Sequence, residues 1–351
     1  GEVLVAVQAS TISSGTEVAE MKSSGDSLYS KALKNPDKII QTINHTSEFG
    51  LKKTFDFIKN KQEEFSPIGY SCSGIVLDVS PEIKDIFIGQ RVACCGSKYA
   101  FHAEYIRVPK NLCVPFSEDI DFKFASTVSL GAIALQGIRR AKPTLGETFV
   151  VIGLGLLGQL TVQLLKANGC RVIAIDKNIS RVKKSIEMGI DYACKDENDL
   201  IAKTKEITSE FGADGVIITA SSESNSIVSQ AFRLCRKKGR VVLVGDVGLT
   251  LNRNDFYKNE IDFLISCSYG PGRYDSRYEE NGLDYPIGYV RWTEKRNMYE
   301  YLSLIKEKKI NLIPLFNKTY SLNKANEAYA SLKNPEAPIL VTLTYESHNI
   351  K

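Results

Sequence analysis

One glycine-rich turn between two apolar runs constrains the fold of this chain more than any other feature. Residues 149–152 form a β-branched run that leads into the spacing G-x-G-x-x-G at Gly153, Gly155 and Gly158. An apolar stretch follows, and a second β-branched run ends at Asp176. Strand, glycine turn, helix and second strand in this order predict a parallel sheet that binds a dinucleotide.

Dinucleotide binding requires a glycine at each of these positions for a different physical reason. Gly153 permits the tight turn, Gly155 lets the backbone approach a pyrophosphate, and Gly158 lets the helix pack closely on the strand. The helix, expected over residues 154–167, directs the free N–H groups of its first turn, which contains Leu156 and Leu157, toward the phosphates. The alternative interpretation is a glycine turn with a structural role only.

Asp176 bears on the choice of dinucleotide. A carboxylate at this position accepts hydrogen bonds from the ribose hydroxyls of adenosine and repels a 2′-phosphate, which favours NAD over NADP. Lys177 and Arg181 flank this acid. They either stack on the adenine or lie solvated at the surface.

Length and composition exclude several classes of function. The chain has 351 residues, enough for two domains, and a net charge of +4. It has no basic block interleaved with aromatics, so we expect no nucleic acid partner. No apolar run is long enough to span a bilayer, and no signal peptide or lipidation motif is recognisable, so we expect no membrane association. The chain opens directly in a strand-like run, which suggests a missing upstream segment.

The eight cysteines predict no metal or disulfide framework, because no C-x-x-C pair occurs. We expect Cys170 and Cys267 in apolar strands and Cys235 in a helix, where a thiol packs as a small hydrophobe. Reduced thiols in a chain of this size predict a cytoplasmic protein.

Apolar patterns divide the chain into three parts. The first, 1–118, is predicted to be a compact β-rich domain, and its polar stretch 23–66 has the spacing of short amphipathic helices. The second, 119–311, alternates strands with helices and predicts a parallel sheet covered on both faces. The third, 312–351, returns to strand-like runs, so we expect the two ends to meet in one domain. The expected strands are 3–7, 74–79, 90–94, 103–108, 149–152, 171–176, 215–219, 240–244, 263–268 and 339–344, with helices at 182–188, 227–235 and 322–332.

This order resembles the medium-chain dehydrogenase/reductase superfamily, in which a Rossmann domain interrupts a GroES-like catalytic domain. The strings SGTE (14–17), LGAIALQG (130–137), SYGPGRYD (268–275) and YVRWTE (289–294) look like the dehydrogenase half of bacterial bi-domain oxidoreductases. Those proteins are linked to surface-polysaccharide gene sets, and bacteriochlorophyllide dehydrogenases are relatives. The resemblance implies an α/β fold with a GroES-like β-rich domain plus a doubly wound parallel sheet. It also implies an NAD-dependent oxidoreductase acting on a hydroxyl or carbonyl of a sugar-like, nucleotide-linked substrate.

Zinc-dependent members of that superfamily hold their metal with C-G-T-D and G-H-E strings. Here Ser14 replaces the cysteine, while Tyr70 and Ser71 replace the histidine and glutamate. Neutral hydroxyls do not substitute for thiolate, imidazole and carboxylate ligands. The four-cysteine structural loop is also missing, since residues 91–105 contain only Cys94 and Cys95. We therefore predict the zinc-lacking branch and no metal.

Without zinc, a side chain must supply the proton and stabilise the charge on the substrate oxygen. Tyr70 either donates a phenolic hydrogen bond or only fills the vacated volume. Glu17 acts as a base, or it organises its loop or pairs with an arginine. Ser14 and Ser71 are expected as hydrogen-bond partners. His102 is expected to be structural.

Residues that follow the central strands should border the cofactor, because ligands bind at the carboxyl ends of parallel strands. Arginines and aromatics further along suit phosphate or carboxylate groups and sugar rings, or alternatively a subunit interface. The cofactor candidates are Thr219, Ala220, Val244, Gly245, Ser268 and Tyr269, and the substrate candidates are Arg273, Tyr274, Arg291 and Trp292.

Two other functions remain open. Zinc-free members of the superfamily include quinone and enone reductases, which usually prefer NADPH, a preference that Asp176 opposes. The second alternative is a partner domain that binds the dinucleotide and catalyses no reaction itself, because the bi-domain relatives carry another oxidoreductase half. The expected partner is accordingly a homodimer mate or a second oxidoreductase domain or subunit.

Overall fold

A computed structural model describes residues 1–18, 67–334 and 337–346. The chain divides into two compact units, one comprising Gly1–Ile12 and Tyr70–Lys351 and the other Ser13–Gly69. Each unit is described by itself. The helices expected over 23–66 lie outside the described residues. None of the described helices is long and apolar enough to cross a membrane.

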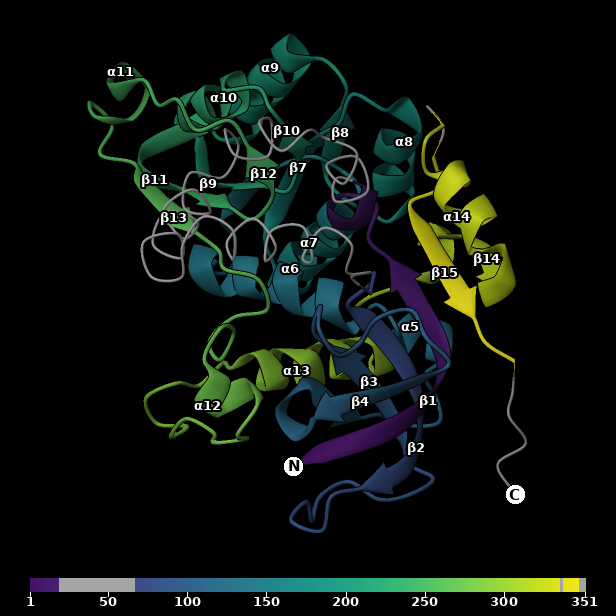
Figure 1. Cartoon of the computed structure of the whole chain (residues 1–351). Helices are drawn as coiled ribbons and strands as arrows, with labels where there is room; N and C mark the ends of the chain where they lie inside the picture. Colours follow the sequence, from purple (N-terminus) through teal and green to yellow (C-terminus); the bar gives the residue numbers. More distant parts are fainter. Residues whose placement is uncertain (19–66, 335–336, 347–351) are drawn as a thin grey trace, which may run out of the picture. The chain divides into compact units, whose positions relative to one another are not determined.

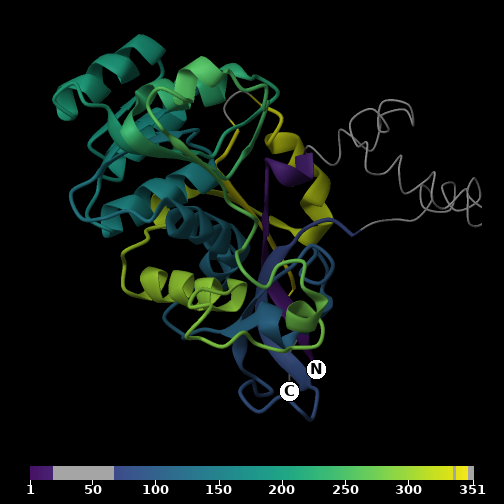
Figure 2. The same cartoon turned by 90° about the vertical axis from the view of Figure 1, so that its left-hand side faces the viewer.

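A seven-stranded sheet in the described part of the chain joins its two ends. The order is β14-β15-β1-β2-β3-β5, with β4 also paired to β1. Strand β1 pairs antiparallel with β15, placing Ala9 opposite Thr344, and Figures 1 and 2 show the two side by side. Alternate valines of β1 are buried, as expected for a sheet with one face on a core. The strands are β1 (Glu2–Ile12), β2 (Ser71–Val79), β3 (Arg91–Cys95), β4 (Tyr105–Pro109), β5 (Cys113–Pro115), β14 (Phe316–Ser321) and β15 (Leu340–Thr344).

A six-stranded parallel sheet forms the second layered structure among the described residues. Its order is β13-β11-β9-β6-β7-β8, and every neighbouring pair is parallel. All five residues of central strand β6 are buried, because helices cover both faces. The strands are β6 (Thr148–Ile152), β7 (Arg171–Ile175), β8 (Tyr192–Cys194), β9 (Ala213–Ile218), β11 (Cys235–Leu243) and β13 (Asp262–Ile265), and a small separate pair is β10 (Ser221–Ser222) with β12 (Asp246–Val247).

Helices surround and connect the two sheets. Most begin at a residue whose side chain accepts a backbone N–H, as Asp196 does for α9 and Thr293 for α13. The helices are α5 (Phe122–Ala125), α6 (Val128–Ala141), α7 (Leu156–Ala167), α8 (Ile179–Glu187), α9 (Glu197–Ile207), α10 (Ser226–Leu234), α11 (Arg253–Phe256), α12 (Ser276–Glu279), α13 (Glu294–Lys306) and α14 (Ala325–Ser331), with 3₁₀ turns η1 (Lys110–Leu112), η2 (Ile313–Leu315) and η3 (Leu322–Lys324).

The structure gives the expected α/β fold and corrects several element boundaries. Cys235 does not lie in a helix: it adopts an extended conformation after α10 and begins β11. Cys170 and Cys267 do not lie in strands either, because β7 begins at Arg171 and β13 ends at Ile265. Cys170 is buried and Cys267 is exposed. Strand β8 was not expected, since three residues are too few to show a period. The helix expected over 322–332 is divided between η3 and α14.

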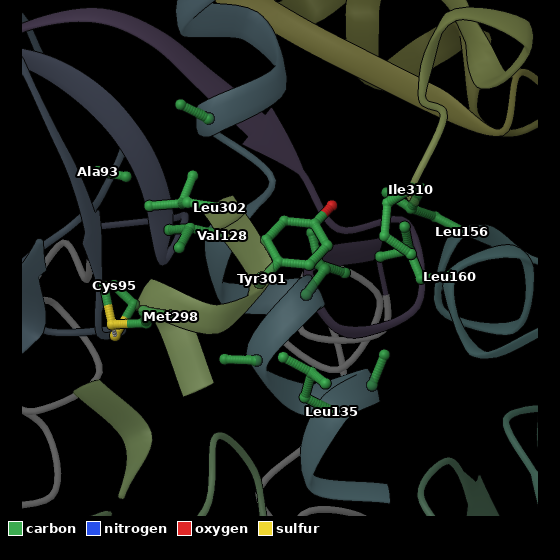
Figure 3. Close-up of a cluster of buried hydrophobic side chains, with 14 of the residues drawn as sticks. Ala93, Cys95, Val128, Leu135, Leu156, Leu160, Met298, Tyr301, Leu302 and Ile310 are labelled. Atoms are coloured by element: carbon green, nitrogen blue, oxygen red, sulfur yellow. Dashed lines mark hydrogen bonds between the residues drawn. The ribbon is translucent and has the colours of Figure 1, made fainter. Parts of the chain in front are cut away.

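Helix α13 packs on α6, with a very close approach at Gly131. The ring of Tyr301 lies against Gly131, where an added Cβ would be 2.3 Å from the ring. Its hydroxyl bonds Thr127 Oγ1 at 2.7 Å. Figure 3 shows Tyr301 in the middle of the cluster, with Cys95 and Met298 on one side and Leu156, Leu160 and Ile310 on the other. This contact fixes the end of segment 266–293, which carries several of the site candidates.

Candidate functional site

Of the three glycines in the turn after β6, only Gly155 has open space beside its Cα. Gly153 has a φ of +102°, and Gly158 packs so tightly that an added Cβ would lie 1.9 Å from Gly153 O. At Gly155 an added Cβ would meet only Arg181 Nη1, at 3.9 Å. Beyond Gly155, α7 begins at Leu156, followed by Leu157. Space above Gly155 together with a helix N-terminus suits a pyrophosphate.

Asp176, just after β7, binds the loop of the glycine turn. Its Oδ2 accepts from Leu154 N at 2.6 Å, and its Oδ1 accepts from Asn178 N at 2.8 Å. Arg181 Nη1 lies 3.6 Å from Oδ2. Each carboxylate oxygen keeps a lone pair for a further donor such as a ribose hydroxyl. Arg181 thus pairs with Asp176 in this structure, while Lys177 has no ion pair among the described residues.

The residues after β9 and β11 form the rim beside the turn. Thr219 donates its hydroxyl to Gly153 O at 2.6 Å. An added Cβ at Gly245 would lie 2.1 Å from Ala220 O, so the two strand ends touch. Val244 packs against Gly137 of α6. The first four sheet-end candidates therefore lie together at the carboxyl edge of the parallel sheet.

Two buried tyrosines meet where the β-rich part adjoins segment 266–293. The rings of Tyr70 and Tyr269 have centroids 6.3 Å apart. Tyr70 O accepts from Gly96 N at 3.0 Å and from Ser129 Oγ at 2.8 Å, which holds its backbone in place. Burial raises the pKa of Tyr269 well above its usual value, and the nearby Cys95 and Tyr70 act in the same direction. The Tyr269 hydroxyl is therefore protonated at neutral pH, a form that is able to donate a hydrogen bond.

The remaining predicted catalytic residues are distributed over both units. Ser71 donates its hydroxyl to Ser126 O at 2.6 Å and accepts from Ser129 N at 3.1 Å. In the other unit, Glu17 Oε1 accepts from Ser13 N at 2.8 Å, and Ser14 is exposed in the same turn. Glu17 thus caps its own loop.

His102 has a structural partner. Its Nδ1 is hydrogen-bonded to Ser10 Oγ at 2.7 Å, and its ring meets Tyr329 edge-on. Both partners belong to the β-rich part of the chain, at β1 and α14. The structural role of His102 stays a prediction, which these contacts support.

The four predicted substrate residues lie on segment 268–296 in two separate groups. The guanidinium of Arg273 lies 5.4 Å from the Tyr269 ring centroid and 4.1 Å from that of Tyr274. Ser268, before Tyr269, has a φ of +46°, which breaks the strand there. Trp292 lies instead between the guanidinium groups of Arg291 and Arg139, at 3.9 and 3.6 Å from the ring centroid.

A buried acid near Arg273 was not expected from the sequence. Arg273 Nη1 pairs with Glu279 Oε1 at 2.7 Å. Glu294 is fully buried, and neither of its carboxylate oxygens has a hydrogen-bond partner among the described residues. Burial raises the pKa of Glu294 to about 9, and the charge of Glu279 adds to the shift. A first-turn acid of a helix usually lies in solvent, so no pattern marks Glu294 as buried.

No group of three or more His, Cys, Asp or Glu residues in the described ranges is arranged to hold a metal ion. Seven of the eight cysteines are buried free thiols. Burial raises the pKa of Cys95, and its Sγ lies 3.3 Å from Met298 Sδ. These thiols pack as hydrophobic groups.

Comparison with known proteins relates the chain to dehydrogenases. Residues 157–281 match the model of the zinc-binding dehydrogenase family. A sorbitol dehydrogenase of Halalkalibacterium halodurans is 28% identical over 231 residues, 64% of this chain and 60% of that protein. A D-guloside 3-dehydrogenase of Shigella flexneri is 25% identical over 289 residues, 79% of this chain and 77% of that protein. Both relatives are named as enzymes that oxidise sugars or polyols.

The whole fold also has a solved counterpart. The crystal structure of galactitol-1-phosphate dehydrogenase from Escherichia coli superposes with a TM-score of 0.73 at 16% identity, covering 98% of this chain and 92% of that one. This chain thus has the same fold as that dehydrogenase. The sequence matches support an oxidoreductase of the medium-chain dehydrogenase type. The family-model match lies outside residues 14–17 and 69–71, so it does not bear on the metal.

Proposed function

We propose that this chain is a zinc-independent, NAD-dependent dehydrogenase for a hydroxyl or carbonyl of a sugar-like, nucleotide-linked substrate in surface polysaccharide synthesis. The observation that carries the proposal is the Tyr70–Tyr269 pair, with ring centroids 6.3 Å apart. Two phenolic groups there offer neutral donors to a substrate oxygen. The names of the sugar and polyol dehydrogenases that it resembles support the substrate class.

The residues at the glycine turn fit NAD. The open face of Gly155, the N-terminus of α7 and the free lone pairs of Asp176 match a pyrophosphate and a ribose. NAD, when bound, supplies the hydride acceptor for alcohol oxidation. Because Asp176 would repel a 2′-phosphate, NAD is favoured over NADP.

The residues at the zinc-ligand positions do not fit zinc. The Ser71 hydroxyl is engaged with Ser126 and Ser129, and the neighbouring Tyr70 carries a phenol where the zinc enzymes have a histidine. Zinc prefers thiolate, imidazole and carboxylate ligands. In our proposal the Tyr70 hydroxyl donates a hydrogen bond to the substrate oxygen and stabilises its developing negative charge. Glu17 is the candidate that accepts the proton lost from the substrate hydroxyl.

Turnover of nucleotide sugars by single-tyrosine variants tests the proposal. Replacing Tyr70 by Phe should lower kcat about 100-fold, because general acid and electrostatic assistance is lost. Tyr289→Phe, at a side chain that is 92% exposed, should leave kcat unchanged. The measurement is NADH formation with a panel of nucleotide sugars. Unchanged kcat in Tyr70→Phe would leave Tyr70 as a space-filling residue.

The same preparation distinguishes the two alternatives. If the protein reduces quinones or enones and binds NADPH more tightly than NADH, it is a quinone or enone reductase and the proposal is wrong. Tight NAD binding without turnover of any substrate would favour a partner domain. One bound zinc per chain, measured by metal analysis, would contradict zinc independence.

A further inference from the structure

A cavity whose lining includes neither Tyr70 nor Tyr269 lies between the start of α13 and the η1 turn. Its volume is about 320 Å³, at the lower end of the range for small-molecule sites. Segment 278–284 closes one side, and Asn111 Nδ2 donates to Tyr278 O at 2.8 Å to hold it there. The lining residues are Asp85, Lys110, Asn111, Tyr278, Gly282, Asp284, Thr293, Lys295, Arg296 and Tyr299.

The charges of this cavity do not cancel. Arg296 is fully engaged, since it pairs with Asp284 and donates to Val290 O at 2.8 Å. Lys295 Nζ lies 3.7 Å from Asp85 Oδ2, too far for a good hydrogen bond. Lys110 makes no ion pair with any acid of the described residues. One ammonium group is thus left without a counter-ion.

Both lysines are held at the cavity by their stems. The Lys295 side chain is only 15% exposed, on the first turn of α13. The Lys110 stem lies across Gly282, whose φ of +70° and lack of a Cβ allow the approach, because an added Cβ would be 2.5 Å from Lys110 Cε. Burial lowers the pKa of Lys295, and the charge of Lys110 acts in the same direction. The two ammonium groups are therefore close enough to repel each other.

We propose that this cavity is an anion site that binds a phosphate group between Lys110 and Lys295. The two ammonium groups line the cavity and can donate to phosphate oxygens, and Thr293 lies beside them at the start of α13. The remaining volume accommodates a sugar ring beside Tyr278 and Tyr299. Free phosphate and a sugar phosphate share this chemistry, and binding measurements separate them.

An occupied site would act on segment 266–293, which carries Tyr269. The ring of Tyr278 packs on Gly272, where an added Cβ would lie 2.5 Å from it. Trp292, the single tryptophan of the chain, directly precedes Thr293. Tryptophan fluorescence therefore reports on the cavity without any turnover.

The test is titration of the full chain with sodium phosphate at constant ionic strength, followed by Trp292 fluorescence and calorimetry. We expect saturable binding, weakened about tenfold or more in Lys110→Gln, since one charge-assisted contact is lost. Lys306→Gln, on the same helix but outside the cavity, is the matched control and should keep the affinity. Because the Lys110 ammonium makes no ion pair with any acid of the described residues, thermal melts of the ligand-free variants should coincide.

Three ligands separate the outcomes. Glucose 1-phosphate binding more tightly than phosphate identifies a sugar phosphate as the ligand, and equal affinities identify free phosphate. Glucose itself should not bind. The proposal is overturned if phosphate fails to saturate by about 50 mM, or if Lys110→Gln and Lys306→Gln bind it equally. These readouts do not depend on dehydrogenase activity, so they can fail or succeed independently of the proposed reaction.

Discussion

At the scale of single residues, Asp176 does two things with one carboxylate. It holds the glycine turn through Leu154 N and Asn178 N, and it keeps Arg181 paired at 3.6 Å. Replacing it by Asn should therefore free Arg181 to bind a 2′-phosphate as well as remove the repulsion. We expect the ratio of NADH to NADPH affinity to fall about tenfold or more in Asp176→Asn, measured by nucleotide fluorescence. Asp176→Asn combined with Arg181→Gln should lose the gained NADPH affinity. An unchanged ratio in Asp176→Asn would contradict this role.

Glu294 makes stability depend on pH. Its pKa is about 9 in the folded chain against an ordinary value of 4.5, so the folded state holds a proton that the unfolded state has released. Stability therefore falls as the pH rises through this interval, by at most about 1.4 kcal/mol per pH unit. Glu294→Gln mimics the protonated form and should lose this slope. Urea unfolding at about pH 6 and about pH 8.5 measures it. Equal slopes in the two proteins would show that Glu294 ionises normally.

At the scale of elements, the α6–α13 contact depends on the absence of one Cβ. Gly131→Ala should destabilise the chain by about 1–3 kcal/mol, because overpacking against Tyr301 outweighs the gain of about 1 kcal/mol in helix propensity. Gly288→Ala, where nothing lies within 4 Å of the added Cβ, is the control. Denaturant unfolding provides the free energies. The double variant Gly131→Ala/Tyr301→Leu should be less destabilised than the sum of the single variants. Additive effects would mean that this contact is not the cause.

Elements were predictable from the sequence where a local pattern repeats. Central strands such as β6 and β7 were expected nearly to the residue, because a buried parallel strand is a continuous apolar run. Predicted element boundaries were wrong where the backbone conformation, and not a side-chain pattern, ends the element. A strand was predicted over 263–268, yet it ends at Ile265 and Ser268 adopts a positive φ. Short elements such as β8 carry too few residues for a period.

At the scale of the whole molecule, the residues that sequence reasoning missed are those brought together by tertiary packing. Lys110 and Lys295 are far apart in the chain and belong to no motif, and they share a cavity only because segment 278–284 folds over the η1 turn. The burial of Glu294 similarly follows from the docking of α13. By contrast, the turn at Gly153, Gly155 and Gly158 was predictable, because its geometry is encoded within six residues.

The pairing of β1 with β15 also governs the order in which the chain can fold during synthesis. Ala9 lies opposite Thr344, so the edge of β1 on that side stays unpaired until strand β15 has left the ribosome. The strands of the parallel sheet, in contrast, are contiguous in sequence and can assemble first. An unpaired strand edge can form backbone hydrogen bonds with other nascent chains. Efficient production of this protein should therefore depend on chaperones or on slow synthesis at low temperature.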